Sequence, residues 1–305
     1  MPKYYQDSIK KPNEDGGLKI LKLFKLIYAS MRILFGILSV LAPRLAARWA
    51  YKMFITPKGL PRPDSEMPYY ESAIHSSTIY NGKKVALYTW GDGAETILLL
   101  HGWASRGTRM GHLAEALVER GYKVIAFDMP AHGDSEGKTT NLFEISELTA
   151  QICDMHGPIH SVIAHSFGGM ALCNAVHRYN LNVNRVVLVA SPFTMKYIFE
   201  SFAAMINITQ KVSDMMIERI RTRFLEERKV DVFELSVDSF VKSLNFPFLV
   251  IHDRDDKVVA YNQGEGYANN LLDAEFVTTE GLGHRRILKE PEIMNKIIEF
   301  ASADK

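Results

Sequence analysis

From residue 96 onward, short apolar runs alternate with segments whose apolar residues recur every three or four positions. Runs such as Thr96–Leu100 are apolar at successive positions, as expected of strands that are buried on both faces of a sheet. The predicted strands are Thr96–Leu100, Tyr122–Asp128, Ile159–Ala164, Val186–Ala190, Phe248–His252 and Ala274–Thr279.

The segments between these runs have the periodicity of amphipathic helices. The predicted helices are Met110–Arg120, Leu142–Met155, Met170–Tyr179, Gln263–Leu271 and Pro291–Ala301. Ahead of them, Ala73–Tyr80 and Lys84–Trp90 flank Asn81-Gly82, and this dipeptide between alternating runs predicts a β-hairpin. The sequence therefore predicts an α/β fold with a mostly parallel, eight-stranded sheet and helices on both faces.

Residues 193–245 interrupt this alternation, because no strand is convincing there. The pattern predicts three helices, at Ile198–Ile208, Val212–Arg228 and Val232–Leu244. An all-helical insert between two strands of a parallel sheet is not an ordinary crossover. We expect it to form a cap over the carboxyl edge of the sheet, where ligands bind in open α/β folds.

An apolar and basic arm precedes the predicted sheet. Residues 16–63 hold nine Lys and Arg side chains and no acid, so residues 64–305 carry a formal charge of −8 if the whole chain is +1. The longest uncharged run, Ile33–Pro43, is too short to cross a bilayer, which takes about 20 apolar residues. The alternatives are helices packed on the body or on a partner subunit, docking on a membrane surface, and a true span that tolerates Arg32. We favour packing.

These patterns predict three parts: an arm and linker at 1–63, a core at 64–192 and 246–305, and a helical cap at 193–245. The hydrophobic share of 47% and charged share of 23% are ordinary for a globular protein, and a net charge of +1 gives no sign of nucleic-acid binding. Cys153 and Cys173 lie in apolar helical patterns, which favours buried free thiols and a cytoplasmic location. No spacing suggests a metal site.

The stretch Val162-Ile-Ala-His-Ser-Phe-Gly-Gly-Met-Ala171 turns sharply from a predicted strand into a predicted helix. A turn this tight strains Ser166, and it requires little or no side chain at Ala164 and Gly168. Ser166 could simply cap the helix, or it could stand on a nucleophile elbow. A nucleophilic serine needs a base, and the base needs an orienting group. Acids follow the strand that ends at His252, and His284 lies in a glycine-flanked loop further on.

These motifs resemble the α/β-hydrolase family, and the resemblance extends from about Tyr80 to the C-terminus. Ala164-His-Ser-Phe-Gly168 is similar to G-x-S-x-G, with Ala in place of the first Gly. His101-Gly-Trp103 resembles the oxyanion segment, and Asp128-Met-Pro-Ala-His-Gly-Asp-Ser135 resembles D-x-P-G-x-G-x-S. His252-Asp-Arg-Asp-Asp256 resembles H-G-x-x-D, with Asp253 in place of Gly. In this register the acid is Asp256, although Asp255 stays an alternative.

The resemblance implies a serine hydrolase of the esterase or lipase type. It makes Ser166 the nucleophile, His284 the base and Asp256 the acid, with no cofactor or metal. It places the oxyanion donors at the backbone N–H groups of Trp103 and Phe167. The residues expected to support these loops are His101, Gly102, His165, Gly168 and Gly169.

The substrate and the reaction are less determined. Aromatic residues of the predicted cap favour a small-molecule ester with an apolar acyl group, although each of them could equally serve packing; they are Phe193, Tyr197, Phe199 and Phe202. The same triad would serve an acyltransferase or a perhydrolase. A non-catalytic protein that binds a ligand or a membrane is a further alternative. The arm could provide peripheral membrane contact or a homodimer interface.

Overall fold

The computed structural model describes the backbone of residues 14–303 and the side chains from residue 26 onward. The chain divides into two compact units. The helical unit holds the described part of Met1–Thr56 together with Thr194–Ser236. The core unit holds Pro57–Phe193 and the described part of Val237–Lys305. The arm and most of the predicted cap thus belong to one unit.

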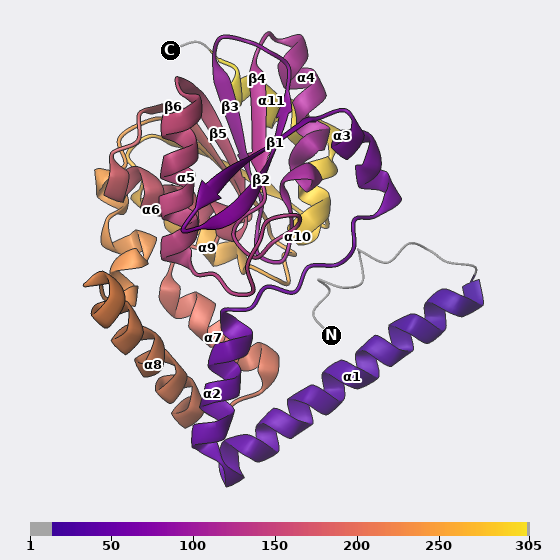
Figure 1. The fold of residues 1–305 in the computed structure, drawn as a ribbon, viewed down its shortest axis with the longest axis vertical. Coiled ribbons are helices and arrows are strands. Elements are labelled where there is room, and N and C mark those ends of the chain that lie inside the picture. The colour runs from indigo at the N-terminus through magenta and orange to yellow at the C-terminus, as the bar shows by residue number, and fades with distance from the viewer. Residues whose placement is uncertain (1–13, 304–305) are drawn as a thin grey trace. The chain divides into compact units, whose positions relative to one another are not determined.

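An eight-stranded sheet forms the centre of the core unit, with the strand order β1-β2-β4-β3-β5-β6-β7-β8 (Figure 1). The pairs β1–β2 and β2–β4 are antiparallel, and all the others are parallel. The strands are β1 (Ile74–Tyr80), β2 (Lys83–Trp90), β3 (Thr96–Leu100), β4 (Lys123–Phe127), β5 (Ile159–His165), β6 (Val183–Val189), β7 (Phe248–Asp253) and β8 (Ala274–Thr279). The predicted sheet is therefore confirmed.

The position of each strand follows from its sequence. All residues of β3, β5 and β7 are buried, and the apolar runs Ile97–Leu100, Val162–Ala164 and Phe248–Ile251 within them are typical of strands covered on both faces. The edge strand β1 mixes apolar and polar residues, and most of its side chains are exposed. Asn81 and Gly82 both have positive φ, 47° and 72°, which matches the hairpin turn that this dipeptide predicts.

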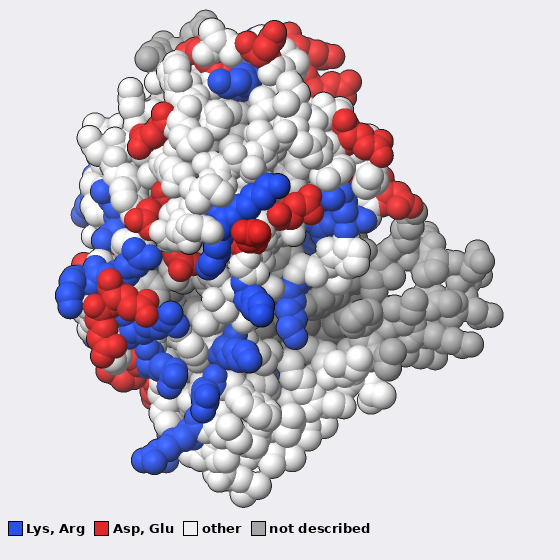
Figure 2. Space-filling model, viewed as in Figure 1, with Lys and Arg blue, Asp and Glu red and all other residues white. Residues whose placement is uncertain are grey.

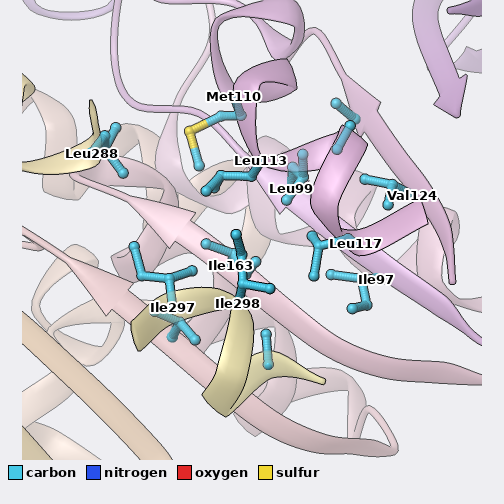
Figure 3. Packing of buried hydrophobic residues seen from close by; sticks show 14 of the residues in the cluster. Ile97, Leu99, Met110, Leu113, Leu117, Val124, Ile163, Leu288, Ile297 and Ile298 are labelled. Atoms are coloured by element: carbon cyan, nitrogen blue, oxygen red, sulfur yellow. The ribbon is translucent and has the colours of Figure 1, made fainter. Parts of the chain in front are cut away.

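Helices cover both faces of the sheet. Figure 3 shows the packing on one face, where side chains of β3, β4 and β5 meet α4 (Ala114–Glu119) and α11 (Pro291–Ala301). The helices α5 (Leu142–His156) and α6 (Phe167–Tyr179) pack against each other. The core unit also contains α3 (Met67–Glu71), α9 (Tyr261–Asn270), α10 (Gly283–Arg286) and the short 3₁₀ segments η2 (Asp64–Glu66) and η7 (Ile287–Lys289). Cys153 of α5 and Cys173 of α6 are free and buried.

Two predicted helices are wrong in type. The segment predicted as Met110–Arg120 begins as a 3₁₀ helix, η3 (Gly107–Leu113), and becomes α-helical only in α4. The segment predicted as Val232–Leu244 forms three 3₁₀ turns instead, η4 (Val232–Leu235), η5 (Val237–Ser239) and η6 (Val241–Ser243). Its buried apolar residues recur at a spacing of three, which suits 3₁₀ turns with three residues per turn.

The helical unit consists of α1 (Glu14–Leu41), α2 (Pro43–Phe54), α7 (Met195–Ile206), α8 (Gln210–Arg228) and η4. Pro43 begins α2 directly after the end of α1, because proline can open a helix but cannot continue one. Ala46 and Ala47 pack against Val212 of α8, where small side chains let the two helices approach closely. The arm helices α1 and α2 thus pack on α7 and α8 of the insert.

Candidate active site

Ser166 occupies a strained turn between β5 and α6. Its backbone has φ 55° and ψ −129°, a conformation that costs about 1–3 kcal/mol for a residue with a side chain. The Ser166 N–H donates to the Val189 carbonyl at 2.9 Å, and the Ser166 carbonyl accepts from the Gly169 N–H at 2.9 Å. The turn is therefore fixed from both sides. Ser166 thus stands on a tight, strained turn from strand to helix.

The glycines after Ser166 are required by close packing. A Cβ at position 168 would lie 2.5 Å from the His101 carbonyl oxygen, and one at position 169 would lie 2.0 Å from Ser191 Oγ. No side chain fits at either place. Gly168 therefore lets the elbow approach the loop that follows β3, and Gly169 lets α6 approach the end of β6.

The loop after β3 lies directly against the serine. A Cβ at Gly102 would lie 2.8 Å from Ser166 Cβ and 3.3 Å from Ser166 Oγ. The rings of Trp103 and Phe167, which follow Gly102 and Ser166 in the chain, meet edge to face with centroids 5.4 Å apart. The structure thus brings together the two residues whose N–H groups are the expected oxyanion donors.

Asp256 and His284 follow β7 and β8, the last two strands of the sheet, and their side chains lie next to Ser166 and to each other. Ser166 Oγ lies 3.0 Å from His284 Nε2 although the two residues are 118 positions apart in the sequence. His284 Nδ1 lies 2.7 Å from Asp256 Oδ2. With the proton on Nδ1, His284 donates to the carboxylate, and its Nε2 can accept the serine proton. All three side chains are largely buried.

The geometry also distinguishes the two candidate acids. Asp256 Oδ1 accepts the N–H groups of Val258 at 2.7 Å and Val259 at 3.0 Å, which directs Oδ2 toward His284. The Asp255 side chain is 58% exposed, and its carboxylate accepts the Gly281 N–H at 3.0 Å. Asp256 is therefore the acid that contacts the histidine.

Two further histidines flank His284. His165 Nε2 donates to the His284 carbonyl at 2.8 Å, and the two rings lie with centroids 4.7 Å apart. His252 Nε2 donates to the Val259 carbonyl at 3.0 Å. Burial lowers the pKa of His165 well below its ordinary value, and it also lowers the pKa of His252. Both rings are thus neutral near pH 7 and act as hydrogen-bonding supports for the histidine and acid loops.

A neutral histidine also supports the loop after β3. His101 Nδ1 donates to the Gly102 carbonyl at 2.7 Å, and its Nε2 accepts the Met129 N–H at 3.0 Å. Burial, with a smaller effect of the neighbouring His132, lowers the pKa of His101 well below its ordinary value. His101 therefore joins this loop to the turn that begins at Asp128.

Asp253 is a structural contributor that the motif did not reveal. Its Oδ2 accepts from Thr279 Oγ1 at 2.7 Å and from the Leu282 N–H at 3.0 Å, which joins the acid loop to the histidine loop. Burial by itself would raise the pKa of Asp253, but the hydrogen bonds from Thr279 and nearby backbone N–H groups outweigh it and lower this pKa. The one hint of this role in the sequence is that Asp253 stands where the family pattern H-G-x-x-D has Gly.

The aromatic residues predicted for the cap do not act as one group. Phe193 belongs to the core unit and packs against Tyr267 of α9, with ring centroids 4.9 Å apart. Phe199 and Phe202 lie in the helical unit, where their rings pack around Phe54 at 5.4 Å and 5.1 Å. These three side chains thus have packing roles within their own units.

Within residues 14–303, no cluster of three or more His, Cys, Asp or Glu side chains is arranged to hold a metal ion. Among the described helices, none combines the length and the apolar character of a membrane-spanning segment.

The sheet order, the strained serine between strand and helix, and the histidine after the last strand are those of the α/β-hydrolase fold. The family profile described as "alpha/beta hydrolase fold" matches residues 95–216.

Known proteins similar to the chain support this assignment. It is 24% identical over 254 residues to non-heme chloroperoxidase CPO-A1 of Kitasatospora aureofaciens, covering 68% of this chain and 90% of the relative. It is 27% identical over 235 residues to lysophosphatidylserine lipase ABHD12 of Danio rerio, covering 68% of this chain but only 58% of the lipase. The crystal structure of a bacterial membrane phospholipase A has a similar fold, with a TM-score of 0.60 at 16% identity, over 92% of this chain and 97% of that one.

Proposed function

We propose that the chain is a serine hydrolase that cleaves carboxylic esters through an acyl-enzyme intermediate. The observation that carries this proposal is the continuous hydrogen-bonded series from Asp256 through His284 to Ser166, with distances of 2.7 Å and 3.0 Å, on a strained elbow. A structural serine would need neither the strain nor a buried base directed at its hydroxyl.

The first half of the reaction forms the acyl-enzyme. His284 Nε2 takes the proton of Ser166 as Oγ attacks the ester carbonyl carbon, and the carbonyl π electrons move onto oxygen. The carbonyl then reforms, the C–O bond to the alcohol breaks, and His284 returns the proton to the leaving alcohol. Asp256 stabilises the imidazolium that exists between these two proton transfers.

The second half uses water in place of the serine. His284 removes a proton from a water molecule, which attacks the acyl carbon, and the bond to Ser166 Oγ then breaks as Oγ recovers the proton. In both halves the N–H groups of Trp103 and Phe167 would stabilise the oxyanion. Phe167 supports this role because it is the first residue of α6, where the helix dipole favours negative charge.

We propose small-molecule esters with an apolar acyl group as the substrate class. The lipase named among the relatives supports this class, although the chain spans only 58% of that protein. The aromatic residues of the predicted cap support this substrate class less than the sequence suggested, because Phe199 and Phe202 pack on Phe54 within the helical unit.

The test is hydrolysis of p-nitrophenyl esters of increasing acyl length by the wild type and by Ser166→Ala. We expect turnover by the wild type and a loss of about 10⁴-fold or more in the variant. Ser161→Ala is a matched control, because Ser161 lies on the same strand and its buried Oγ has no hydrogen-bond partner among the described residues. Equal loss in both variants, or no loss in Ser166→Ala, would reject Ser166 as the nucleophile.

A second reaction has one specific observation in its favour, the similarity to a non-heme chloroperoxidase. In a perhydrolase or an acyltransferase, the same acyl-enzyme would pass its acyl group to peroxide or to an alcohol instead of water. Adding each acceptor during ester turnover separates the reactions. A rise in peracid or new ester at the expense of free acid would favour transfer.

A further inference from the structure

An exposed apolar face runs along the described part of α1. Seven large apolar side chains are exposed there, several of them by more than half; they are Leu26, Ile27, Ile33, Leu34, Ile37, Val40 and Leu41. At about 100° per residue these positions fall within an arc of about 140° on one side of the helix. Scattered exposed apolar residues are common in proteins, but a continuous helical face of this kind marks an interaction surface.

The opposite side of α1 is already used for packing on the insert. Tyr28 Oη donates to the Met205 carbonyl at 2.8 Å, and Arg32 Nη1 donates to the carbonyls of Ala204 and Met205, each at 2.7 Å. Further along, Phe35 is buried and Ser39 Oγ accepts the Thr209 N–H at 3.4 Å. Since one side of α1 is bonded to protein, the helix can present only its other side to a partner.

The helix that follows α1 adds positive charge to this surface. Arg44, Arg48 and Lys52 are exposed and recur every four residues, so they form one stripe along α2. Leu45 and Trp49, 41% and 44% exposed, form the neighbouring stripe. No ion pair or side-chain hydrogen bond joins these three cations to another residue in the part of the chain that the structure describes.

The charge of the surrounding sequence has the same sign. Residues 16–63 contain no Asp or Glu. Figure 2 shows an uncharged surface over the described part of α1, with Lys and Arg gathered beside it over α2. On the neighbouring α8, the Arg219 guanidinium lies over the Tyr51 ring, 5.3 Å from its centroid, and Arg223 donates to Tyr51 Oη at 2.6 Å. The exposed faces of α1 and α2 therefore combine apolar area with the positive charge of Arg44, Arg48 and Lys52.

We propose that the exposed faces of α1 and α2 dock on the surface of an anionic lipid bilayer. The apolar side chains of α1 would enter the boundary between headgroups and acyl chains, with Trp49 at the headgroup level, while Arg44, Arg48 and Lys52 contact lipid phosphates. Basic residues beside an apolar face, with Trp among them, are the composition of helices that lie in this interface.

A second copy of the chain fits this surface less well. A two-fold dimer would place the same patch on both partners, so that cations would face cations or apolar side chains with no acid to pair them. Anionic headgroups supply the missing negative charge. The proposal concerns the helical unit and does not depend on the esterase reaction.

The experiment is co-sedimentation of the full chain with vesicles, in the Ser166→Ala background so that the lipids stay intact. The vesicles contain either phosphatidylcholine alone or equal parts of phosphatidylcholine and phosphatidylglycerol. We expect binding to the anionic vesicles, weakened by salt, and much weaker binding to the neutral ones. Each cation near such a surface changes the affinity about fivefold, so Arg44→Gln/Arg48→Gln/Lys52→Gln should bind on the order of 100-fold more weakly.

The matched control is Lys83→Gln/Lys138→Gln/Lys242→Gln, which removes the same charge from exposed positions of the core unit. It should bind like the parent. A second variant, Val40→Ser/Leu41→Ser, should weaken binding to anionic vesicles with no change in salt dependence. Equal binding by the two triple variants, or equal binding to neutral and anionic vesicles, would overturn the proposal.

A separate measurement tests whether a second copy of the chain covers this surface. Sedimentation velocity without lipid would show a dimer if a second copy covers this face. A concentration-dependent dimer that Val40→Ser/Leu41→Ser dissociates, combined with no vesicle binding, would overturn lipid docking in favour of self-association.

Discussion

Replacing Asp256 by Asn tests the residue that orients the histidine of the proposed triad. Asp256 Oδ1 accepts two backbone N–H groups, and Oδ2 accepts the His284 Nδ1–H. In Asp256→Asn the single amide oxygen stays with the two backbone donors, so the amide NH₂ faces His284 Nδ1. His284 must then carry its proton on Nε2, where it can no longer accept the proton of Ser166.

The wrong tautomer removes the base while leaving the fold in place. We expect kcat to fall about 10⁴-fold, equivalent to roughly 5.5 kcal/mol of transition-state stabilisation. KM should change little, because the carboxylate does not contact substrate. The assay is steady-state hydrolysis of the best p-nitrophenyl ester, with thermal unfolding as the check that the variant is folded.

Asp255→Asn is the matched control for this prediction. Its side chain is 58% exposed, and the amide oxygen can still accept the Gly281 N–H. We expect its kcat within about twofold of the wild type. If Asp256→Asn kept more than a tenth of the activity, or if Asp255→Asn lost as much, the tautomer argument would be refuted.

Three further variants test the surroundings of the site. Gly102→Ala should lower kcat about 100-fold and also lower the unfolding midpoint, because its Cβ would lie 2.8 Å from Ser166 Cβ on a turn that is fixed from both sides; unchanged turnover and midpoint would contradict this packing. Ala131→Gly should raise the free energy of unfolding in urea by up to about 1 kcal/mol, since Ala131 has φ 64°, and a lower free energy would show that this conformation is not strained. Because the pKa of Asp253 is lowered in the fold, its ionised carboxylate stabilises the protein above about pH 4, and this contribution is lost as the pH falls below that value. The free energy of unfolding of Asp253→Asn should therefore fall less than that of the wild type between about pH 4 and pH 2, and parallel curves of free energy against pH would contradict the prediction.

The order of strands and helices was predictable because burial leaves a strong pattern. Thr96–Leu100 and the centre of β5, Val162–Ala164, are apolar at almost every position, as is typical of a strand covered on both faces. The type of helix was harder to predict at Val232–Leu244. Apolar residues spaced by three fit a short 3₁₀ turn as well as an α-helix, and only tertiary packing decides between the two.

Those parts of the candidate site that depend on local backbone geometry could be predicted from the sequence. Small residues around Ser166 indicate the elbow, and the order of serine, acid and histidine indicates which loops meet. Spacing could not distinguish Asp255 from Asp256, because the choice depends on the N–H groups that orient the carboxylate. The hydrogen bond from His165 to the His284 carbonyl likewise joins residues 119 positions apart, and no local sequence pattern indicates that these two residues meet.

The helical unit is built from two segments that the chain makes at very different times. Contacts such as Tyr28 with Met205 and Tyr51 with Arg223 join residues 177 and 172 positions apart. During synthesis the arm therefore emerges long before α7 and α8, and its apolar side chains have no native partner until the core strands up to β6 have been made. We expect the core unit to fold first and the arm to join the insert late. An N-terminal deletion would then leave α7 and α8 without the surface on which they assemble.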